Sequence, residues 1–364
     1  MNSLLRLLLK SQHQRNRSGP AQTEKGMTLV ELLVGSIMAF LIITPMLAFV
    51  VDMLNTDRRE QVKSNTEQDI QAAVDFIAQD LSQAIHIYDN NPTTGIPALL
   101  DGDFIPKGGA GIPILVFWKR EIIRSAIPVD NTKTPQPKDC PPDPPPAGQQ
   151  KLCNDAYVLS LVAYYQVTDN SPSIWCQQSA GNTCPPRIAR YQIKSGLENN
   201  KSLTTGQPYT DFKPEQKRHL AYNAGDPAAN QPPFDITKPE QNVTTGANNF
   251  DEPPPVLVNY IDHSASPNAP PLSLTECQTA LGNPTDPQDP TQVLDEDTLK
   301  VSDQETTKTN SFYACVDTAR NIARVTIRGN SLRRLETPAD YDPKKSAYFP
   351  TASVQVQGRG ALGK

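Results

Sequence analysis

The sequence predicts an α+β fold in which one long N-terminal helix packs on an antiparallel β-sheet. Three observations lead to this fold class. The run Leu32–Val51 holds twenty residues without a charge. Apolar residues then recur every three or four positions as far as Tyr88, which is the period of a helix. The rest of the chain contains short segments in which apolar and polar residues alternate, as in strands with one buried face.

Residues 1–26 carry five basic side chains and one acidic side chain, Glu24. Positive charge ahead of an apolar helix keeps that end in the cytoplasm, so we expect the C-terminal bulk of the chain to be exported. Residues 27–51 are long enough to cross a bilayer as a helix. Glu31 is the one ionisable side chain among them, and a carboxylate inside an apolar helix needs a partner.

The run Gly26-Met27-Thr28-Leu29-Val30-Glu31 resembles the type IV prepilin signature of glycine, an aromatic residue, Thr-Leu and a glutamate. Met27 replaces the usual phenylalanine and keeps that position apolar. The resemblance implies that residues 1–26 are a leader and that a prepilin peptidase cuts between Gly26 and Met27. It further implies that the new amine of Met27 is methylated and that Glu31 docks on a neighbouring pilin.

Two other interpretations of this segment are weaker. A secretory signal peptide would have a shorter apolar core followed by a small-residue cleavage site, for which Val50-Val51-Asp52 is a poor substitute. A plain, uncleaved signal anchor fits the apolar run but gives no reason for Glu31.

Residues 52–90 are expected to be the amphipathic half of the same helix, which we expect to run from 27 to 88. Pro45 should kink its apolar half, and Asn90-Asn91-Pro92 should end it. Polar residues, Asp80 among them, are expected away from the apolar stripe. The stripe consists of Ile70, Val74, Ile77, Leu81, Ala84, Ile85 and Tyr88, and we expect it to cover one face of the sheet.

Residues 91–364 are expected to form a β-rich head. Alternation is clearest where Ala323, Val325 and Ile327 should face inward. The chain has 35 prolines, and two proline-rich stretches, about 130–150 and 198–310, bury too little apolar surface to offset ordering. We expect them to be long loops or partly disordered insertions. Strands are expected at 114–118, 157–167, 188–193, 312–316, 322–328 and 353–357.

Six cysteines lie beyond the helix, on the side expected to be exported, where oxidation is normal. No spacing matches a zinc site, so disulfides are the main interpretation. Fifteen pairings of six cysteines exist. Short loops favour Cys140–Cys153 and Cys176–Cys184, which leaves Cys277–Cys315.

No catalytic motif is present, so we expect a non-catalytic protein without a resident cofactor. The one exception considered is calcium, which clustered loop carboxylates suit; a solvated loop is the alternative. The leader accounts for +4, so removing it changes the net charge from −5 to −9, and no nucleic-acid partner is expected. The calcium candidates are Asp286, Asp289, Asp295, Glu296 and Asp297.

The chain as a whole resembles the minor pseudopilins of the J/W type. The runs Val51–Arg58 and Glu67–Gln71 are similar to those of the pseudopilins that serve hormogonium polysaccharide secretion in cyanobacteria. This resemblance implies a structural component of a pilus-like or type II secretion-like filament that supports polysaccharide secretion and gliding motility. Its partners would be membrane lipid before assembly, other pilins or pseudopilins, the peptidase and an inner-membrane assembly platform. A glycan- or surface-binding minor pilin at the filament tip is the alternative.

Overall fold

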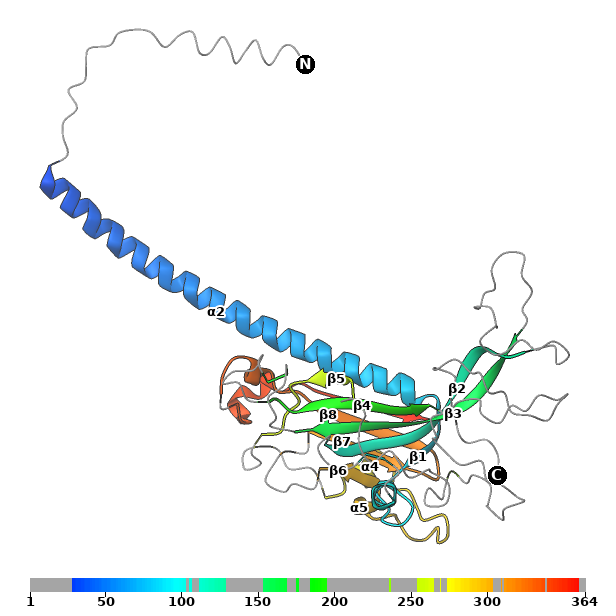
Figure 1. Ribbon diagram of the computed structural model, residues 1–364. Coiled ribbons are helices and arrows are strands. Elements are labelled where there is room, and N and C mark those ends of the chain that lie inside the picture. The colour runs from blue at the N-terminus through cyan, green and yellow to red at the C-terminus, as the bar shows by residue number, and fades with distance from the viewer. Residues whose placement is uncertain are drawn as a thin grey trace, which may run out of the picture. The chain divides into compact units, whose positions relative to one another are not determined.

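The computed structural model consists of one long helix and a β-rich head made of two antiparallel sheets (Figure 1), which confirms the predicted α+β class. The chain divides into two compact units, residues 1–58 and 59–364, so the last part of the helix belongs with the head. The structure describes residues 28–102, 105–106, 111–128, 153–168, 175–176, 184–194, 236, 254–264, 269, 274–303, 309, 311–337 and 339–359.

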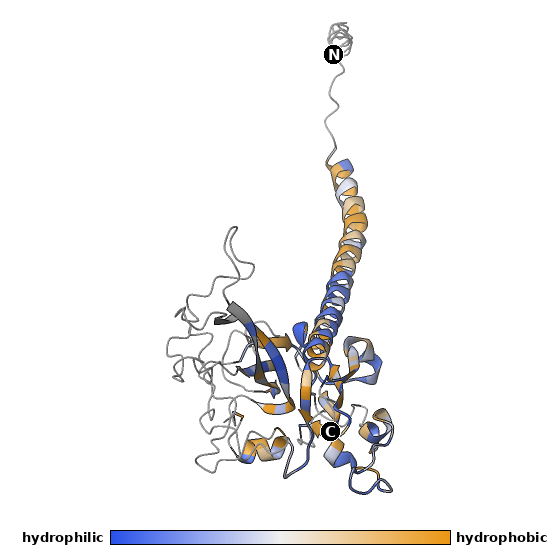
Figure 2. Cartoon of the chain, turned by 90° about the vertical axis from the view of Figure 1, so that its right-hand side faces the viewer, coloured by the Kyte–Doolittle hydropathy of each residue, from blue (hydrophilic) through white to orange (hydrophobic). Residues whose placement is uncertain are grey.

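The long helix, α2 (Leu29–Leu81), has 53 residues and contains Pro45. Its length is about 80 Å at 1.5 Å per residue. Figure 2 shows that apolar residues dominate its N-terminal part and polar residues the following turns. The large apolar side chains from Leu29 to Leu54 are all exposed. Among the described residues, α2 is the helix long and apolar enough to cross a membrane.

The C-terminal turns of α2 pack on the head as predicted. Ile70, Val74, Ile77 and Leu81 are each at most 1% exposed and join the main hydrophobic core. Gly329 lies directly beneath this part of the helix. A Cβ placed on Gly329 would lie 2.9 Å from Thr66 Cγ2. The absence of a side chain there therefore allows the helix and the sheet to approach closely.

The helix is shorter than the sequence suggested. It ends at Leu81, and Ala84–Tyr88 is a strand, β1. The predicted stripe residues Ala84 and Tyr88 are buried, but from a strand rather than a helix. The segment is rich in β-branched and aromatic residues, and pairing with its neighbour in the sheet decides the conformation.

The first sheet has the strand order β1-β2-β3-β4-β5. Lys119 at its centre points toward α2, and β2 also contacts the second sheet. Because both faces of the sheet are covered here, every residue of Ile114–Trp118 is buried, which explains why the segment is apolar throughout. The remaining strands are β2 (Ile112–Pro128), β3 (Cys153–Val167), β4 (Arg187–Lys194) and β5 (Val256–Asn259).

The second sheet has the order β6-β7-β8-β9. Ala323, Val325 and Ile327 face the core, as predicted. Its strands are β6 (Lys300–Ser302), β7 (Phe312–Asp317), β8 (Ile322–Arg328) and β9 (Thr351–Gln357). Short helices complete the head: α3 (Ile96–Asp101), α4 (Glu276–Ala280), α5 (Glu296–Leu299), η8 (Ser331–Arg334) and η9 (Pro343–Tyr348).

All six predicted strands are present, most of them longer than expected. The second predicted insertion, 198–310, extends too far, because residues 254–303 supply two strands and two helices to the head. The stretch at 130–150 lies outside the described residues.

Candidate functional site

The first turn of α2 carries Glu31. Thr28 precedes the helix, and its Oγ1 accepts a hydrogen bond from the Glu31 backbone N–H at 3.3 Å. A Thr followed three residues later by Glu is the sequence pattern of a capping box, and a carboxylate in the first turn interacts favourably with the helix dipole. Among the residues described, no cation contacts the Glu31 carboxylate, which is exposed. The helix start thus holds an unpaired negative charge beside an apolar run.

The predicted processing site and one predicted disulfide cannot be placed. Gly26, Met27 and Cys140, the expected partner of Cys153, lie outside the described residues. The other two predicted bridges are confirmed, Cys176–Cys184 and Cys277–Cys315. Disulfides of this kind are typical of proteins in an oxidising compartment.

The predicted calcium ligands do not converge on one point in the structure. Both carboxylate oxygens of Glu296 accept hydrogen bonds of 2.9–3.0 Å from the backbone N–H groups of Cys277 and Gln278, at the start of α4. Asp286 and Asp289 accept hydrogen bonds from backbone N–H groups two residues ahead. Asp295 occupies the N-cap position of α5, and Asp297 is exposed. Among the described residues no three acidic, histidine or cysteine side chains form a metal site.

A buried acid in α2 was missed by the sequence analysis. Asp80, expected on the polar side of the helix, is 7% exposed. Its Oδ1 accepts a hydrogen bond from Lys119 Nζ at 2.9 Å, and its Oδ2 accepts from Arg190 Nε and Tyr164 Oη, both at 2.7 Å. These partners come from β2, β4 and β3, so one carboxylate ties α2 to three adjacent strands. Asp80 lies between Ile77 and Leu81 in the helix, beside the apolar stripe, and that position was the available signal.

The polar network continues along the sheet. Lys119 Nζ also contacts Glu121 Oε1 at 2.9 Å, and Glu121 accepts hydrogen bonds from Gln192 and Ser160. Two acids and two bases therefore balance in charge where helix and sheet meet. Burial by itself raises the pKa of Asp80, but hydrogen bonds from Arg190 and Tyr164, the Arg190 charge and Lys119 together lower it below 3.8.

A second buried acid, Asp262, connects the segment after β5 to the second sheet. Its Oδ2 accepts a hydrogen bond from Arg328 Nε at 3.0 Å and forms an ion pair with Arg328 Nη2 at 3.0 Å. The same oxygen accepts hydrogen bonds from Thr309 and Ser311. Asp262 is 1% exposed. Because these donors satisfy the hydrogen-bonding capacity of the Asp262 carboxylate, we interpret the arrangement as a structural junction between the two sheets.

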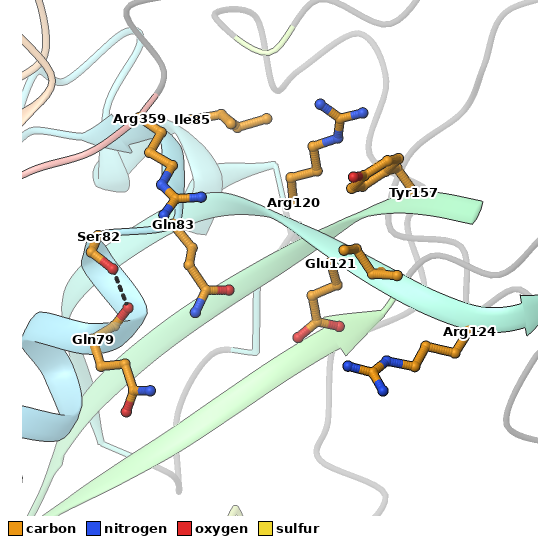
Figure 3. A pocket seen from close by; sticks show the side chains of 10 residues that line it. Gln79, Ser82, Gln83, Ile85, Arg120, Glu121, Arg124, Tyr157 and Arg359 are labelled. Atoms are coloured by element: carbon orange, nitrogen blue, oxygen red, sulfur yellow. Dashed lines mark hydrogen bonds between the residues drawn. The ribbon is translucent and has the colours of Figure 1, made fainter. Parts of the chain in front are cut away.

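One cleft lined by described residues of the head, named the larger cleft below, has a volume of about 1030 Å³ (Figure 3). The end of α2 and Arg359 lie along one side of it, and β2 with Tyr157 of β3 lies along the other. The guanidinium of Arg120 lies over the Tyr157 ring, 3.7 Å from its centre. This surface is cationic and exposed. Its lining residues are Gln79, Ser82, Gln83, Ile85, Arg120, Glu121, Ile122, Arg124, Tyr157 and Arg359.

A smaller cleft of about 370 Å³ is lined by Asp69, Trp175, Asn259, Tyr260 and Arg334. Arg334 Nη2 contacts Asp69 at 2.8 Å, and its guanidinium lies 4.4 Å from the centre of the Tyr260 ring. Arg334 Nε is buried without a hydrogen-bond partner. Tyr260 has φ of 61°, a left-handed conformation that is rare for a bulky residue and is concentrated at functional sites.

Comparison of the chain with protein-family models, with curated proteins and with solved structures found no match.

Proposed function

We propose that the chain is a minor pseudopilin of the J/W type, a non-catalytic subunit of a pilus-like or type II secretion-like filament. The observation that carries the proposal is the start of α2. An unpaired Glu31 opens a long apolar helix whose side chains are exposed, directly after the Gly26-Met27 motif. A membrane anchor alone accounts for the apolar surface but not for a charge within it.

In this proposal the apolar part of α2 has two successive environments. It first lies in the inner membrane, with the N-terminus in the cytoplasm and the head in the periplasm. An assembly platform then transfers it into a filament, where neighbouring helices cover the same apolar side chains. The exposed residues Leu29–Leu54 fit both environments, because each offers an apolar contact surface.

Glu31 would set the position of one subunit against the next. Its carboxylate would pair with the methylated amine that processing creates on Met27 of a neighbour. Desolvation of both charges offsets much of their attraction, so the pair contributes more to register than to affinity. A subunit in the wrong register would leave Glu31 without a partner in an apolar environment. The narrower role, in polysaccharide secretion and gliding, rests on the resemblance of the Val51–Arg58 and Glu67–Gln71 runs.

Glu31→Gln tests this role. We expect the variant to be processed and inserted as well as the wild type, because neither step needs the charge, and to be depleted from sheared filaments. Asp52→Asn, which removes an exposed charge from the same helix, is the matched control and should assemble normally. A tip subunit has no subunit ahead of it, so weak depletion would indicate the tip and strong depletion the shaft or base. Loss of processing or insertion in Glu31→Gln would contradict the docking role.

A second candidate function, a glycan-binding minor pilin at the filament tip, is favoured by the smaller cleft. Trp175 and Tyr260 offer aromatic surface, and Asp69, Asn259 and Arg334 offer hydrogen-bonding groups. A glycan array probed with the full chain tests this candidate. Binding that Trp175→Ala abolishes and Tyr157→Ala retains would support it, and no binding by the wild type would exclude it.

A further inference from the structure

The strand β2 has an edge that its neighbour β1 covers only in part. β1 pairs with β2 over Val116–Lys119, where Ala84 is the first residue of β1 and faces Lys119. On the other side, β3 accompanies β2 as far as Pro128. From Arg120 onward, no strand among the described residues lies on the β1 side. Within the part of the chain that the structure describes, the backbone N–H and C=O groups along that edge have no strand partner and can pair with another strand.

The larger cleft lies beside this edge. Ahead of Ala84 the chain turns back into α2, since Gln83 N–H donates to the Asp80 carbonyl. Gln79, Ser82 and Gln83 consequently form one wall of the cleft while β2 from Arg120 to Arg124 forms the other. A strand added next to β2 would occupy the space that β1 leaves.

The surroundings of the edge are positively charged. Arg120, Arg124 and Arg359 line the cleft against one acid, Glu121, whose carboxylate is already contacted by Lys119, Gln192 and Ser160. Figure 3 shows Arg120 on one side of β2 and Arg124 on the other. Among the described residues no acidic side chain pairs with Arg124 or Arg359. The chain as a whole has a net charge of −5, so this concentration of positive charge runs against its average.

Apolar surface completes the edge. Ile122 is 53% exposed and Tyr157, its direct partner on β3, is 59% exposed. The stacking of Arg120 on Tyr157 holds one guanidinium in place, which lowers the entropy cost of binding an anion.

We propose that the β2 edge, Arg120–Arg124, binds an extended acidic segment of another protein chain by strand addition. The segment would form a ladder with β2 and would place one acid near Arg120 and another near Arg124. A protein partner is favoured over an acidic polysaccharide because unpaired peptide groups at strand spacing are matched by another peptide backbone. This inference is independent of the proposed assembly role of Glu31.

The test uses the full-length chain in detergent micelles and a fluorescein-labelled peptide of about eight residues, the length of a typical strand. In this peptide pairs of glutamates alternate with pairs of valines, so that both faces of the strand carry acids. Fluorescence anisotropy measures binding, and isotope-edited infrared spectroscopy reports whether the bound peptide is a paired strand. We expect binding that Arg124→Glu weakens at least about tenfold and that Lys344→Glu, an exposed charge reversal outside the cleft, changes less than about twofold. A circular dichroism melt verifies that Arg124→Glu remains folded.

Two further probes separate strand addition from simple charge attraction. The same peptide with two adjacent central amides N-methylated cannot pair through either edge and should not bind. Equal binding of that peptide, or displacement of the original peptide by polygalacturonate at similar affinity, would overturn the proposal in favour of a general polyanion site. Absence of binding by the original peptide would also overturn it, and would mean that the arginines only protect the edge from pairing.

Discussion

Asp80 is the residue on which the contact between α2 and the first sheet depends most. Its carboxylate is buried and accepts hydrogen bonds from Lys119, Arg190 and Tyr164. Removing its charge would leave Arg190 without its acidic partner and would leave Glu121 as the one acid in contact with Lys119 in this partly buried network. The charge balance between α2 and the first sheet therefore depends on the Asp80 carboxylate.

Asp80→Asn should lower the free energy of unfolding of the full chain by about 3–5 kcal/mol, the cost of breaking one partner out of a buried ion pair. Asp75→Asn is the matched control, because Asp75 is exposed on the same helix and its carboxylate accepts a hydrogen bond from Gln71 at 3.0 Å. It should change stability by no more than about 0.5 kcal/mol. Denaturant unfolding followed by tryptophan fluorescence measures both. Equal effects of the two substitutions would show that the network contributes nothing beyond a surface acid.

The pH dependence of stability follows from the lowered pKa of Asp80. A carboxyl group whose pKa is lower in the folded chain than in the unfolded chain stabilises the fold above pH 3.8, and this contribution disappears as the pH falls through the folded-state pKa. The stability difference between the wild type and Asp80→Asn should therefore be full at pH 7 and shrink below about pH 4. Burial raises the pKa of Asp89, which acts in the opposite direction. A difference that stays constant down to about pH 2 would contradict this assignment.

At the scale of residues, sequence reasoning could find Glu31 but not Asp80. Glu31 is conspicuous because no other charge lies near it in the apolar run. Asp80 lies among Gln79, Asp75 and other polar residues, and its partners are 39 to 110 positions away in the chain. Its position beside the apolar stripe was the one local signal, because long-range pairing itself leaves no pattern in the neighbouring sequence.

At the scale of elements, the two disulfides close loops of different size. Cys176 and Cys184 are separated by 8 positions and Cys277 and Cys315 by 38. The chain-entropy treatment of cross-links assigns about 2.5 kcal/mol to the shorter loop and about 4 kcal/mol to the longer one. The second bridge also lies in a small core with Leu281, Leu299 and Tyr313.

Replacing Cys277 and Cys315 with serine should consequently destabilise the head more than the same change at Cys176 and Cys184. Thermal unfolding of both double variants, compared under non-reducing conditions, measures the order. The reverse order would mean that strain or residual structure in the unfolded chain outweighs loop closure.

The sequence predicted the regular elements better than their ends. Strands with clear alternation or a continuous apolar run, such as β2 and β8, were found because their burial imposes the pattern. The helix end was misplaced because Ala84 and Tyr88 satisfy the helical period and the strand's burial equally well. The short strands β5 and β6 carry too few residues to show any period.

At the scale of the whole molecule, the proposal joins three parts with different chemistry. A basic segment, residues 1–26, precedes an apolar helix that opens with Glu31, and a disulfide-linked head of two sheets follows. Each part alone has simpler explanations, since an apolar helix also serves as an anchor and bridged β-rich heads serve many functions. Their order along the chain, with the Gly26-Met27 junction between the first two, is what favours a processed filament subunit.

The N-terminus of the protein isolated from its native membrane tests this central claim most directly. Mass spectrometry of the N-terminal peptide should show a chain that begins at Met27 and carries one methyl group on its amine. Gly26→Ala should reduce this product mildly, whereas a bulky residue at 26 should block it. A chain that retains residues 1–26 in cells with an active prepilin peptidase would contradict the account.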